Sequence, residues 1–232
     1  MPVFRLRREL VFPDPAQAEE GLLAVGGDLS LPRLLLAYGS GIFPWYGEED
    51  PILWWSPETR AVLRPGQLHL SARTRRSLRR RPFEIRFDSA FEAVIAACAT
   101  VPRPGQEGTW ITPEMRAAYV DLHRAGHAHS VEAWREGELR GGLYGVALGG
   151  AFFGESMFSL EPEASRAALQ ALDARLAARG FTLIDGQLPH EGLAGYGFQA
   201  VPRAQFLQQL AEALRTQVPG GSWALDRDVN CH

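Results

Sequence analysis

The amino-acid sequence predicts an α+β protein, in which a mixed, mainly antiparallel sheet flanked by helices follows a small N-terminal lobe. Two observations predict this class. The spacing of apolar residues changes from a helical to a strand-like period near residue 129, and glycine-containing turns separate the runs that follow. The 232 residues suffice for one large or two small domains. We expect an α/β lobe over residues 1–62 and a second domain over residues 63–232.

The first sixty residues predict one helix and an aromatic-rich loop. Ser30 is expected to cap a helix that begins at LPRLLLAYG, because a serine side chain can accept a hydrogen bond from the first turn. Pro57 and Pro65 bracket a predicted strand over residues 60–63, where the lobe meets the second domain. The aromatic residues of the loop are Phe43, Trp45, Tyr46, Trp54 and Trp55.

Three helices and a strand are expected in the middle of the chain. Ser71 can cap a short helix over Ala72–Arg80, which Pro82 ends because the residue before proline disfavours the helical conformation. A strand over residues 84–88 and helices over residues 90–99 and 113–124 follow.

The remaining pattern predicts three strands, a helix and a further strand. Strands over residues 129–135, 139–149 and 151–159 are joined by tight turns, and the helix Ala164–Arg179 ends at Gly180. A strand over residues 181–185 comes next. Three antiparallel strands, a helix and then a strand is the core order of the GNAT acyltransferase fold. From Thr216 onward the chain is poorly patterned, and we expect partial order at best.

Composition excludes several classes of protein. Every cationic side chain other than histidine is arginine, so Schiff-base chemistry and a phosphate-loop lysine are excluded. No apolar run is long enough to span a membrane, and the N-terminus has no secretory apolar segment. With only two cysteines, Cys98 and Cys231, we expect neither a disulfide framework nor a cysteine metal site. We therefore expect a cytoplasmic protein.

One segment is strongly basic in an otherwise acidic chain. Residues 61–86 contain eight arginines and a single acidic residue, whereas the whole protein has a formal net charge of −3. Arginine forks match phosphate geometry, so the cluster predicts contact with a nucleic-acid backbone, and a solvated basic face is the alternative. The candidate phosphate-binding residues are Arg73, Arg75, Arg76, Arg79, Arg80 and Arg81.

Three polar residues lie at or near the ends of neighbouring apolar strands. Glu155 lies in GESMFS, and Asp185 and Gln187 lie in LIDGQ. The spacing of two residues predicts that Asp185 and Gln187 share one face of a strand. Carboxylates in such places are costly unless they are paired or take part in chemistry, and a structural pair with arginine is the alternative.

Two further motifs are discounted. His127 and His129 have a spacing found in metal sites, but no third ligand is evident, so we expect no metal. Ser156 does not lie in a nucleophile elbow, and no histidine is evidently placed to activate it.

Eight blocks, in order along most of the chain, resemble the leucyl/phenylalanyl-tRNA–protein transferases. They are GLLAVGGDLS (Gly21–Ser30), GIFPWY (Gly41–Tyr46), ILWWSPETR (Ile52–Arg60), GTWITPEM (Gly108–Met115), GHAHSVEAW (Gly126–Trp134), GESMFS (Gly154–Ser159), LIDGQ (Leu183–Gln187) and VPRAQFL (Val201–Leu207). The resemblance implies a GNAT-like C-terminal domain behind a small N-terminal one.

The resemblance also implies a reaction and its partners. Leu or Phe, and Met less readily, would move from aminoacyl-tRNA to the α-amino group of proteins that begin with Arg or Lys, which marks them for degradation as N-degrons. An aminoacyl ester is already activated, so no cofactor is expected. The partners would be Leu-tRNA, Phe-tRNA and these acceptor proteins, and we expect a monomer that does not bind membranes.

The chemistry of this reaction suggests roles for the polar residues, and the resemblance assigns those of the pocket. Asp185 would orient Gln187, Gln187 would hold the attacking amine or the developing oxyanion, and Glu155 would recognise the basic acceptor side chain. Which of the two carboxylates takes the proton is left open. The aminoacyl pocket would consist of Trp110, Leu143, Phe152, Met157 and Ile184. Trp45 would stack on the terminal adenine of the tRNA, with Tyr119 as a second candidate there.

The chain departs from the family pattern in three places. Gly186 replaces the usual cysteine, and the segment 188–198 is shifted, so His190 is assigned no family role. Arg166 replaces the usual lysine. None of these changes touches Glu155, Asp185 or Gln187.

Two other functions are alternatives to the tRNA-dependent transferase. An acyl-CoA-dependent GNAT enzyme needs a glycine-rich, phosphate-binding turn between strand and helix, but the sequence there is the acidic SLEPEAS. A non-catalytic RNA-binding module would use the arginine cluster alone, and it would leave GESMFS and LIDGQ unexplained.

Overall fold

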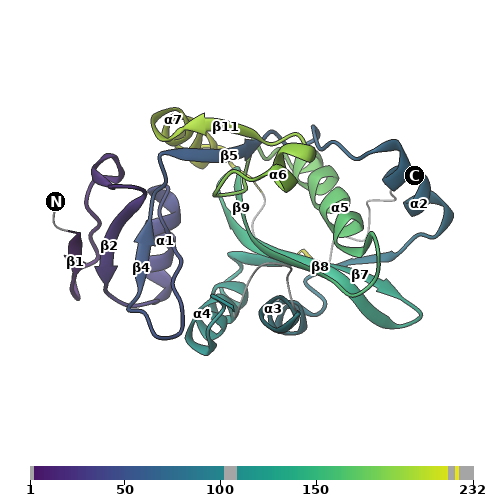
Figure 1. Ribbon diagram of the computed structural model, residues 1–232, viewed down its shortest axis with the longest axis horizontal. Coiled ribbons are helices and arrows are strands. Elements are labelled where there is room, and N and C mark those ends of the chain that lie inside the picture. Colours follow the sequence, from purple (N-terminus) through teal and green to yellow (C-terminus); the bar gives the residue numbers. More distant parts are fainter. Residues whose placement is uncertain (1–2, 102–108, 219–222, 225–232) are drawn as a thin grey trace.

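A computed structural model describes residues 3–101, 109–218 and 223–224. Its described strands form a four-stranded sheet, in the order β1-β2-β4-β3, and a seven-stranded sheet, in the order β11-β5-β10-β9-β8-β7-β6. Helices cover both faces of the larger sheet, and the small sheet lies at one end of the molecule (Figure 1). This arrangement confirms the predicted α+β class.

The small sheet is built from the first strands of the chain. Its strands are β1 (Phe4–Leu6), β2 (Leu22–Gly26), β3 (Phe43–Pro44) and β4 (Leu53–Trp55), and a 3-10 turn, Pro15–Gln17, precedes β2. The predicted helix is confirmed as α1 (Leu31–Gly39). Ser30 occupies the N-cap position but makes no side-chain capping hydrogen bond. α1 buries Leu34, Ala37 and Tyr38.

The large sheet is antiparallel apart from one strand pair. Its strands are β5 (Thr59–Leu63), β6 (Glu84–Phe87), β7 (Ala128–Arg135), β8 (Glu138–Leu148), β9 (Ala151–Ser159), β10 (Leu183–Asp185) and β11 (Gln199–Pro202). β9 and β10 run parallel, because α5 returns the chain across the sheet between them. Glu136 and Gly137 form the predicted β7–β8 turn with φ angles of 54° and 78°.

Six further helices lie between or after the strands of the large sheet. They are α2 (Ala72–Arg80), α3 (Phe91–Thr100), α4 (Pro113–Arg124), α5 (Ala164–Ala178), α6 (Glu191–Gly195) and α7 (Arg203–Leu214). α3 and α4 lie on one face and α5 on the other (Figure 1). Ser71 caps α2 as predicted, since its hydroxyl accepts a hydrogen bond from the Thr74 amide.

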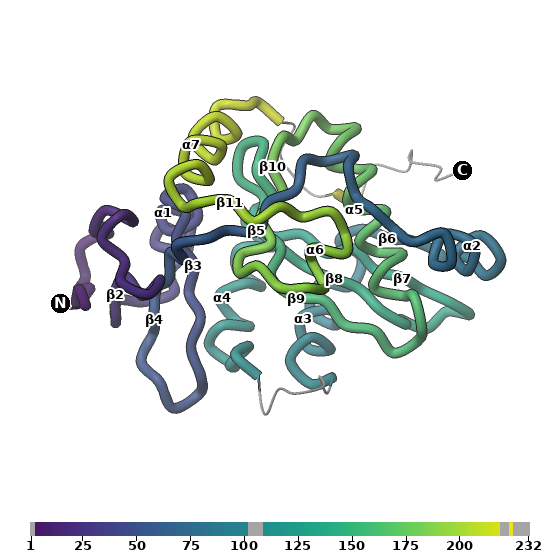
Figure 2. The backbone as a smooth tube through the Cα atoms, turned by 45° about the horizontal axis from the view of Figure 1, so that its top comes forward, coloured from purple at the N-terminus to yellow at the C-terminus, as the bar shows by residue number. Residues whose placement is uncertain are grey.

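Strand β5 crosses the predicted domain boundary and lies between β11 and β10 in the large sheet (Figure 2). Apolar residues of α1 and the small sheet, such as Tyr38 and Trp54, share one buried cluster with Phe153 and Val146 of the large sheet. The boundary at residue 62 stays a prediction.

Two details differ from the sequence expectation. β10 ends at Asp185, and Gln187 has a φ angle of 62°, so Asp185 and Gln187 do not share a strand face. In the poorly patterned tail, Trp223 is only 2% exposed because it packs beneath α5. Among the described residues no helix is long and apolar enough to cross a membrane.

Candidate active site

The candidate active site opens where strands β9 and β10 separate. β10 pairs with β9 only from Leu183 to Asp185, whereas β9 continues to Ser159. Just beyond the last pair, the β8–β9 register shifts between Tyr144 and Gly145, which leaves Glu155 as the extra residue of a β-bulge. Bulges redirect a side chain out of the regular alternation, and this one turns Glu155 towards the opening.

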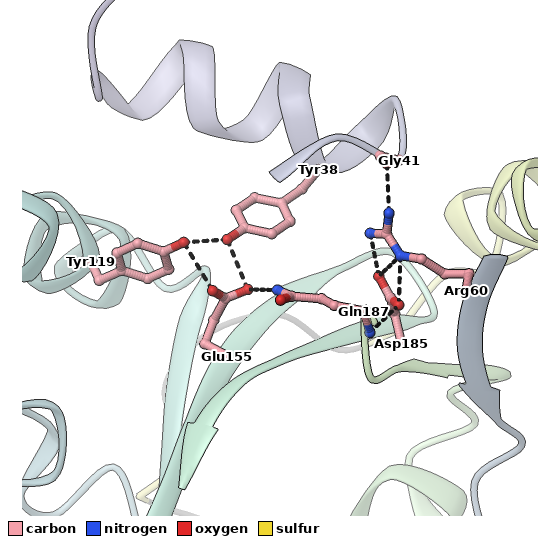
Figure 3. A network of polar contacts seen from close by, with 7 residues as sticks. All are labelled: Tyr38, Gly41, Arg60, Tyr119, Glu155, Asp185 and Gln187. Carbon is pink, nitrogen blue, oxygen red and sulfur yellow. Dashed lines mark hydrogen bonds and ion pairs between the residues drawn. The ribbon is translucent and has the colours of Figure 1, made fainter. Parts of the chain in front are cut away.

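Glu155 accepts three hydrogen bonds at this opening (Figure 3). Its Oε1 accepts from the Tyr38 hydroxyl and from Gln187 Nε2, both at 2.8 Å, and its Oε2 accepts from the Tyr119 hydroxyl at 3.1 Å. Burial raises the pKa of Glu155 to about 7, although the two phenols act in the opposite direction. The carboxyl group is therefore able to exchange a proton near neutral pH.

Tyr38, Tyr119 and Glu155 form a closed ring of hydrogen bonds. Tyr38 and Tyr119 also hydrogen-bond to each other, so the carboxyl group and two hydroxyls share three contacts.

Asp185 has a different environment. It is fully buried, and the Arg60 guanidinium donates to it from Nε at 2.9 and 3.2 Å and from Nη2 at 2.7 Å. Arg60 Nη1 also donates to the Gly41 carbonyl at 3.0 Å, and its guanidinium lies over the rings of Phe43 and Phe206 at 4.7 and 4.4 Å. Asp185 therefore forms the structural pair with an arginine that sequence reasoning leaves open as the alternative to a chemical role.

Gln187 connects the two carboxylates (Figure 3). Its backbone N–H donates to Asp185 Oδ1 at 2.8 Å, while its side-chain amide donates to Glu155. The left-handed backbone conformation of Gln187 forms a turn that brings its two N–H donors to the two carboxylates. The sequence alone predicts instead that the alternation of side chains along a strand brings Asp185 and Gln187 together.

A cavity of about 500 Å³ lies beside this network, between the sheet and helices α5 and α6. Four of the predicted pocket residues line it, namely Leu143, Phe152, Met157 and Ile184. Glu155, Asp185 and His190 line it as well, so the carboxylates and the apolar walls share one space.

Three other predicted residues are not among those that line the cavity. Trp45 is 41% exposed and makes an edge contact with Trp55, and Trp110 packs half-buried against the core. Tyr119 is fully buried, and its hydroxyl contacts Glu155 from α4.

The six arginines predicted to bind phosphate are all exposed on or next to α2. Thr74 is buried and Leu78 packs against the buried cluster of Ala133, Ala164 and Ala167, so the helix turns its other face to solvent. Arg81 pairs with Glu161 at 3.2 Å.

Of the two discounted histidines, His129 is buried and His127 is half-buried. His129 Nδ1 lies 2.9 Å from Asp88 Oδ2, and its ring stacks on Trp223 with centroids 4.0 Å apart. Within the described residues, no group of three or more His, Cys, Asp or Glu could hold a metal ion.

Sequence reasoning did not single out Tyr38 and Arg60. Tyr38 lies on the apolar face of α1, and Arg60 lies in an apolar strand, where each has the pattern of an ordinary core position. Their roles come from contacts 117 and 125 residues apart in sequence, which no local pattern encodes.

Comparison with known proteins bears directly on this site. The family model described as Leucyl/phenylalanyl-tRNA protein transferase matches residues 62–211, and that of its N-terminal domain matches residues 27–58. The proteins named leucyl/phenylalanyl-tRNA–protein transferase from Anaeromyxobacter sp. (strain Fw109-5) and Myxococcus xanthus are 56% and 54% identical to this chain. The alignments cover 97% and 96% of this chain and 97% of each relative. The chain belongs to this family.

Membership of the leucyl/phenylalanyl-tRNA–protein transferase family confirms the resemblance seen in the sequence blocks, and it identifies the protein as an aminoacyltransferase. Among solved structures, that of L-PGS from Bacillus licheniformis is similar at a TM-score of 0.41 and 10% identity, over 85% of this chain and 72% of that chain. A similarity at this level supports no conclusion about the fold.

Gly186 has a structural consequence at the cavity. A Cβ atom there would lie 2.8 Å from Leu193 Cδ1 and 2.9 Å from Phe198 Cε1. Both neighbours belong to or border α6 and also line the cavity. The missing side chain thus lets the shifted segment 188–198 close over this side of the site.

Proposed function

We propose that this aminoacyltransferase moves Leu or Phe from aminoacyl-tRNA to the α-amino group of proteins that begin with Arg or Lys. The observation that supports this best is the chain of contacts from Asp185 through Gln187 to Glu155 at the wall of an apolar cavity. One space thus offers an apolar site for a donor side chain and polar groups for an amine.

The donor side chain would enter the cavity between Leu143, Phe152, Met157 and Ile184. These walls are apolar and have no polar group selective for one hydrophobic side chain, which suits a site that accepts both Leu and Phe. Trp110 is assigned to the outer part of this site, and Trp45 to stacking on the terminal adenine, for which its exposed ring is suited. Tyr119 is assigned to the Glu155 network, through which it would act on the acceptor.

The acceptor would approach Glu155 and Gln187. The ionised carboxylate of Glu155 attracts a cationic N-terminal residue, and Gln187 positions the amine, with Asp185 and Arg60 fixing the Gln187 backbone. The amine nitrogen forms a bond to the ester carbonyl carbon, and the bond from that carbon to the ribose oxygen breaks. The amine loses one proton and the leaving ribose oxygen gains one.

Glu155 is our candidate for the group that takes the amine proton. Asp185 is held by two arginine nitrogens, whereas Glu155 has no such counter-charge and its pKa is raised to about 7. A base is most effective when its pKa lies near the working pH. The α-amine has an ordinary pKa near 8, so a modest base suffices.

The exposed arginines of α2 would bind the tRNA backbone. They extend from a helix whose other face is packed on the protein, so their geometry is fixed relative to the cavity. We further propose a GNAT-like catalytic domain over residues 63–232, and a monomer that works in the cytoplasm and marks its acceptors for degradation.

A transfer assay tests the proposed function. Radiolabelled Leu-tRNA is incubated with two peptides that differ only in an N-terminal Arg or Ala, and acetyl-CoA is offered in a parallel reaction. Label on the Arg peptide alone supports both the reaction and its acceptor preference. Acetylation without label transfer would favour the acyl-CoA enzymes instead. Binding of tRNA without either reaction would favour an RNA-binding module.

A further inference from the structure

Trp223 lies beyond the residues matched by either family model, yet it is among the most buried side chains of the protein. Its indole stacks on His129, with centroids 4.0 Å apart and the two planes inclined by only 2°. Its edges contact Phe87 and Phe181 at centroid distances of 6.3 and 6.2 Å. Trp223 therefore fills a closed site in the interior.

The backbone of Trp223 is held on both sides. Its N–H donates to Asp88 Oδ2 at 2.8 Å, and its carbonyl accepts from Arg175 Nη2 of α5 at 2.6 Å. Asp88 also contacts His129, and hydrogen bonds hold the pKa of Asp88 below its ordinary value although burial alone would raise it. These two backbone hydrogen bonds and the stacking on His129 together fix the position of the Trp223 indole.

Trp223 and the cavity occupy opposite ends of one space between α5 and the sheet. The α5 residues that line the cavity are Ser165, Leu169 and Leu172. Trp223 contacts the C-terminal end of this helix, where the guanidinium groups of Arg175 and Arg179 lie 5.6 and 5.7 Å from its ring. Phe152, Leu169, Leu172 and Trp223 belong to one buried cluster.

Phe152 separates the two ends. It lines the cavity, and its ring centroid lies 5.9 Å from that of Trp223. Its ring rests over Gly145, where a Cβ atom would lie 2.5 Å from Phe152 Cζ. Phe152 is fully buried, so its ring can withdraw from the cavity only if the side chains packed around it, Trp223 among them, give way.

We propose that Trp223 is a positioning residue that sets the depth of the aminoacyl pocket by holding Phe152 in place. This inference rests on the proposed function, because it takes the cavity as the site of the donor side chain. Loss of the indole would let Phe152 retreat and lengthen the pocket, which favours donors with larger side chains.

The experiment measures kcat/KM with tRNA charged with Leu, Phe or Trp, for the wild-type protein and for Trp223→Leu and Trp223→Phe. Each variant is compared with the wild type on the same donor, so differences between tRNA molecules cancel. We expect Trp223→Leu to raise the Phe-to-Leu and Trp-to-Leu ratios by about tenfold, with Trp223→Phe in between. Leu23→Ala, a core change in the small sheet, is the matched control and should leave both ratios unchanged.

Phe152→Leu separates failure of this inference from failure of the proposed function. If Phe152→Leu changes the donor ratios and Trp223→Leu does not, the pocket assignment stands and the proposal for Trp223 is overturned. If neither variant changes the ratios of an active enzyme, the cavity is not the donor site and both assignments are wrong. Circular dichroism and thermal unfolding show that each variant is folded, and Trp223→Phe remains informative where Trp223→Leu does not fold.

Discussion

Asp185 and Glu155 are two carboxylates on adjacent strands of the same sheet, and they differ in what surrounds them. Asp185 is paired with Arg60 through two guanidinium nitrogens, and the guanidinium group lies over the rings of Phe43 and Phe206. Glu155 is surrounded by hydroxyl and amide groups, and its pKa is raised to about 7. A buried acid paired with a fixed arginine supports structure, whereas one whose hydrogen-bond partners are all neutral can gain and lose a proton.

Removing the counter-charge of Asp185 should have the largest effect. Arg60→Met leaves a buried carboxylate unpaired, and we expect the free energy of unfolding to fall by about 3–5 kcal/mol, with loss of transfer. Urea unfolding measures the first effect and single-turnover transfer the second. The double variant Arg60→Met, Asp185→Leu should recover most of the stability but not the transfer rate. Wild-type transfer by the double variant would show that Asp185 does not orient Gln187.

Glu155→Gln should leave the fold intact and lower single-turnover transfer by about 10²–10³-fold, because the amide cannot take a proton. The hydrogen-bond ring survives, since the Tyr119 oxygen can accept from the new amide. Glu132→Gln is the matched control. Glu132 is a buried glutamate of β7 whose pKa is also raised by burial, but it contacts Ser130 and Ser89 instead of the cavity. Equal losses in both variants would contradict a specific role for Glu155.

The same pair of variants tests the pH dependence. Below pH 7 wild-type Glu155 is protonated and neither attracts a cation nor accepts a proton, so the transfer rate should rise as pH passes through about 7. This step should be absent in Glu155→Gln and present in Glu132→Gln. The raised pKa also means that Glu155 stabilises the fold at pH values below its unfolded pKa and loses that contribution as pH rises through 7. The free energy of unfolding of Glu155→Gln relative to wild type should therefore increase between the ordinary pKa of 4.5 and about pH 7, by no more than about 3 kcal/mol.

The arginines of α2 contact neither Asp185 nor Glu155. Replacing them should therefore change tRNA binding and leave the titration of Glu155 as it is. We expect Arg76→Gln, Arg80→Gln to weaken tRNA binding by about tenfold at moderate salt and to lower the salt slope by about one per phosphate contact. The pH step near 7 should not move. Arg124→Gln is the control, because this exposed arginine of α4 pairs with Glu92 and Asp121. An equal effect of the control would make the arginine cluster a general surface charge.

Tyr38→Phe should produce the smallest change. The Tyr38 hydroxyl lowers the pKa of Glu155, so its loss should move the pH step upward and reduce transfer at pH 7 by roughly threefold. The rate at high pH should approach that of the wild type. A step that stays in place, measured by the same pH series, would show that the ring of hydroxyls does not control the proton of Glu155.

Local sequence patterns predicted most of the secondary structure. Ser71 and Thr74 satisfy a cap that the sequence encodes within four residues, and the Glu136-Gly137 turn follows from residues that tolerate positive φ. Family blocks also identified Glu155, Asp185 and Gln187, which the structure brings into one network. Sequence reasoning failed at Gln187, where a left-handed turn and not a strand face joins it to Asp185.

The sequence by itself determined the α+β class, the family, the exposed arginine helix and the apolar walls of the cavity. The periodicity of apolar residues is a local property of the chain, and the motifs occur in the same order as in the family. Tertiary structure alone decided which acid is paired with an arginine and which is hydrogen-bonded only to neutral groups. Arg60 reaches Asp185 and Tyr38 reaches Glu155 across more than a hundred residues, and Trp223 returns from the tail to the centre of the protein. Burial and counter-charge are set by such distant neighbours, so the ionisation of a carboxylate cannot be inferred from the residues beside it in the chain.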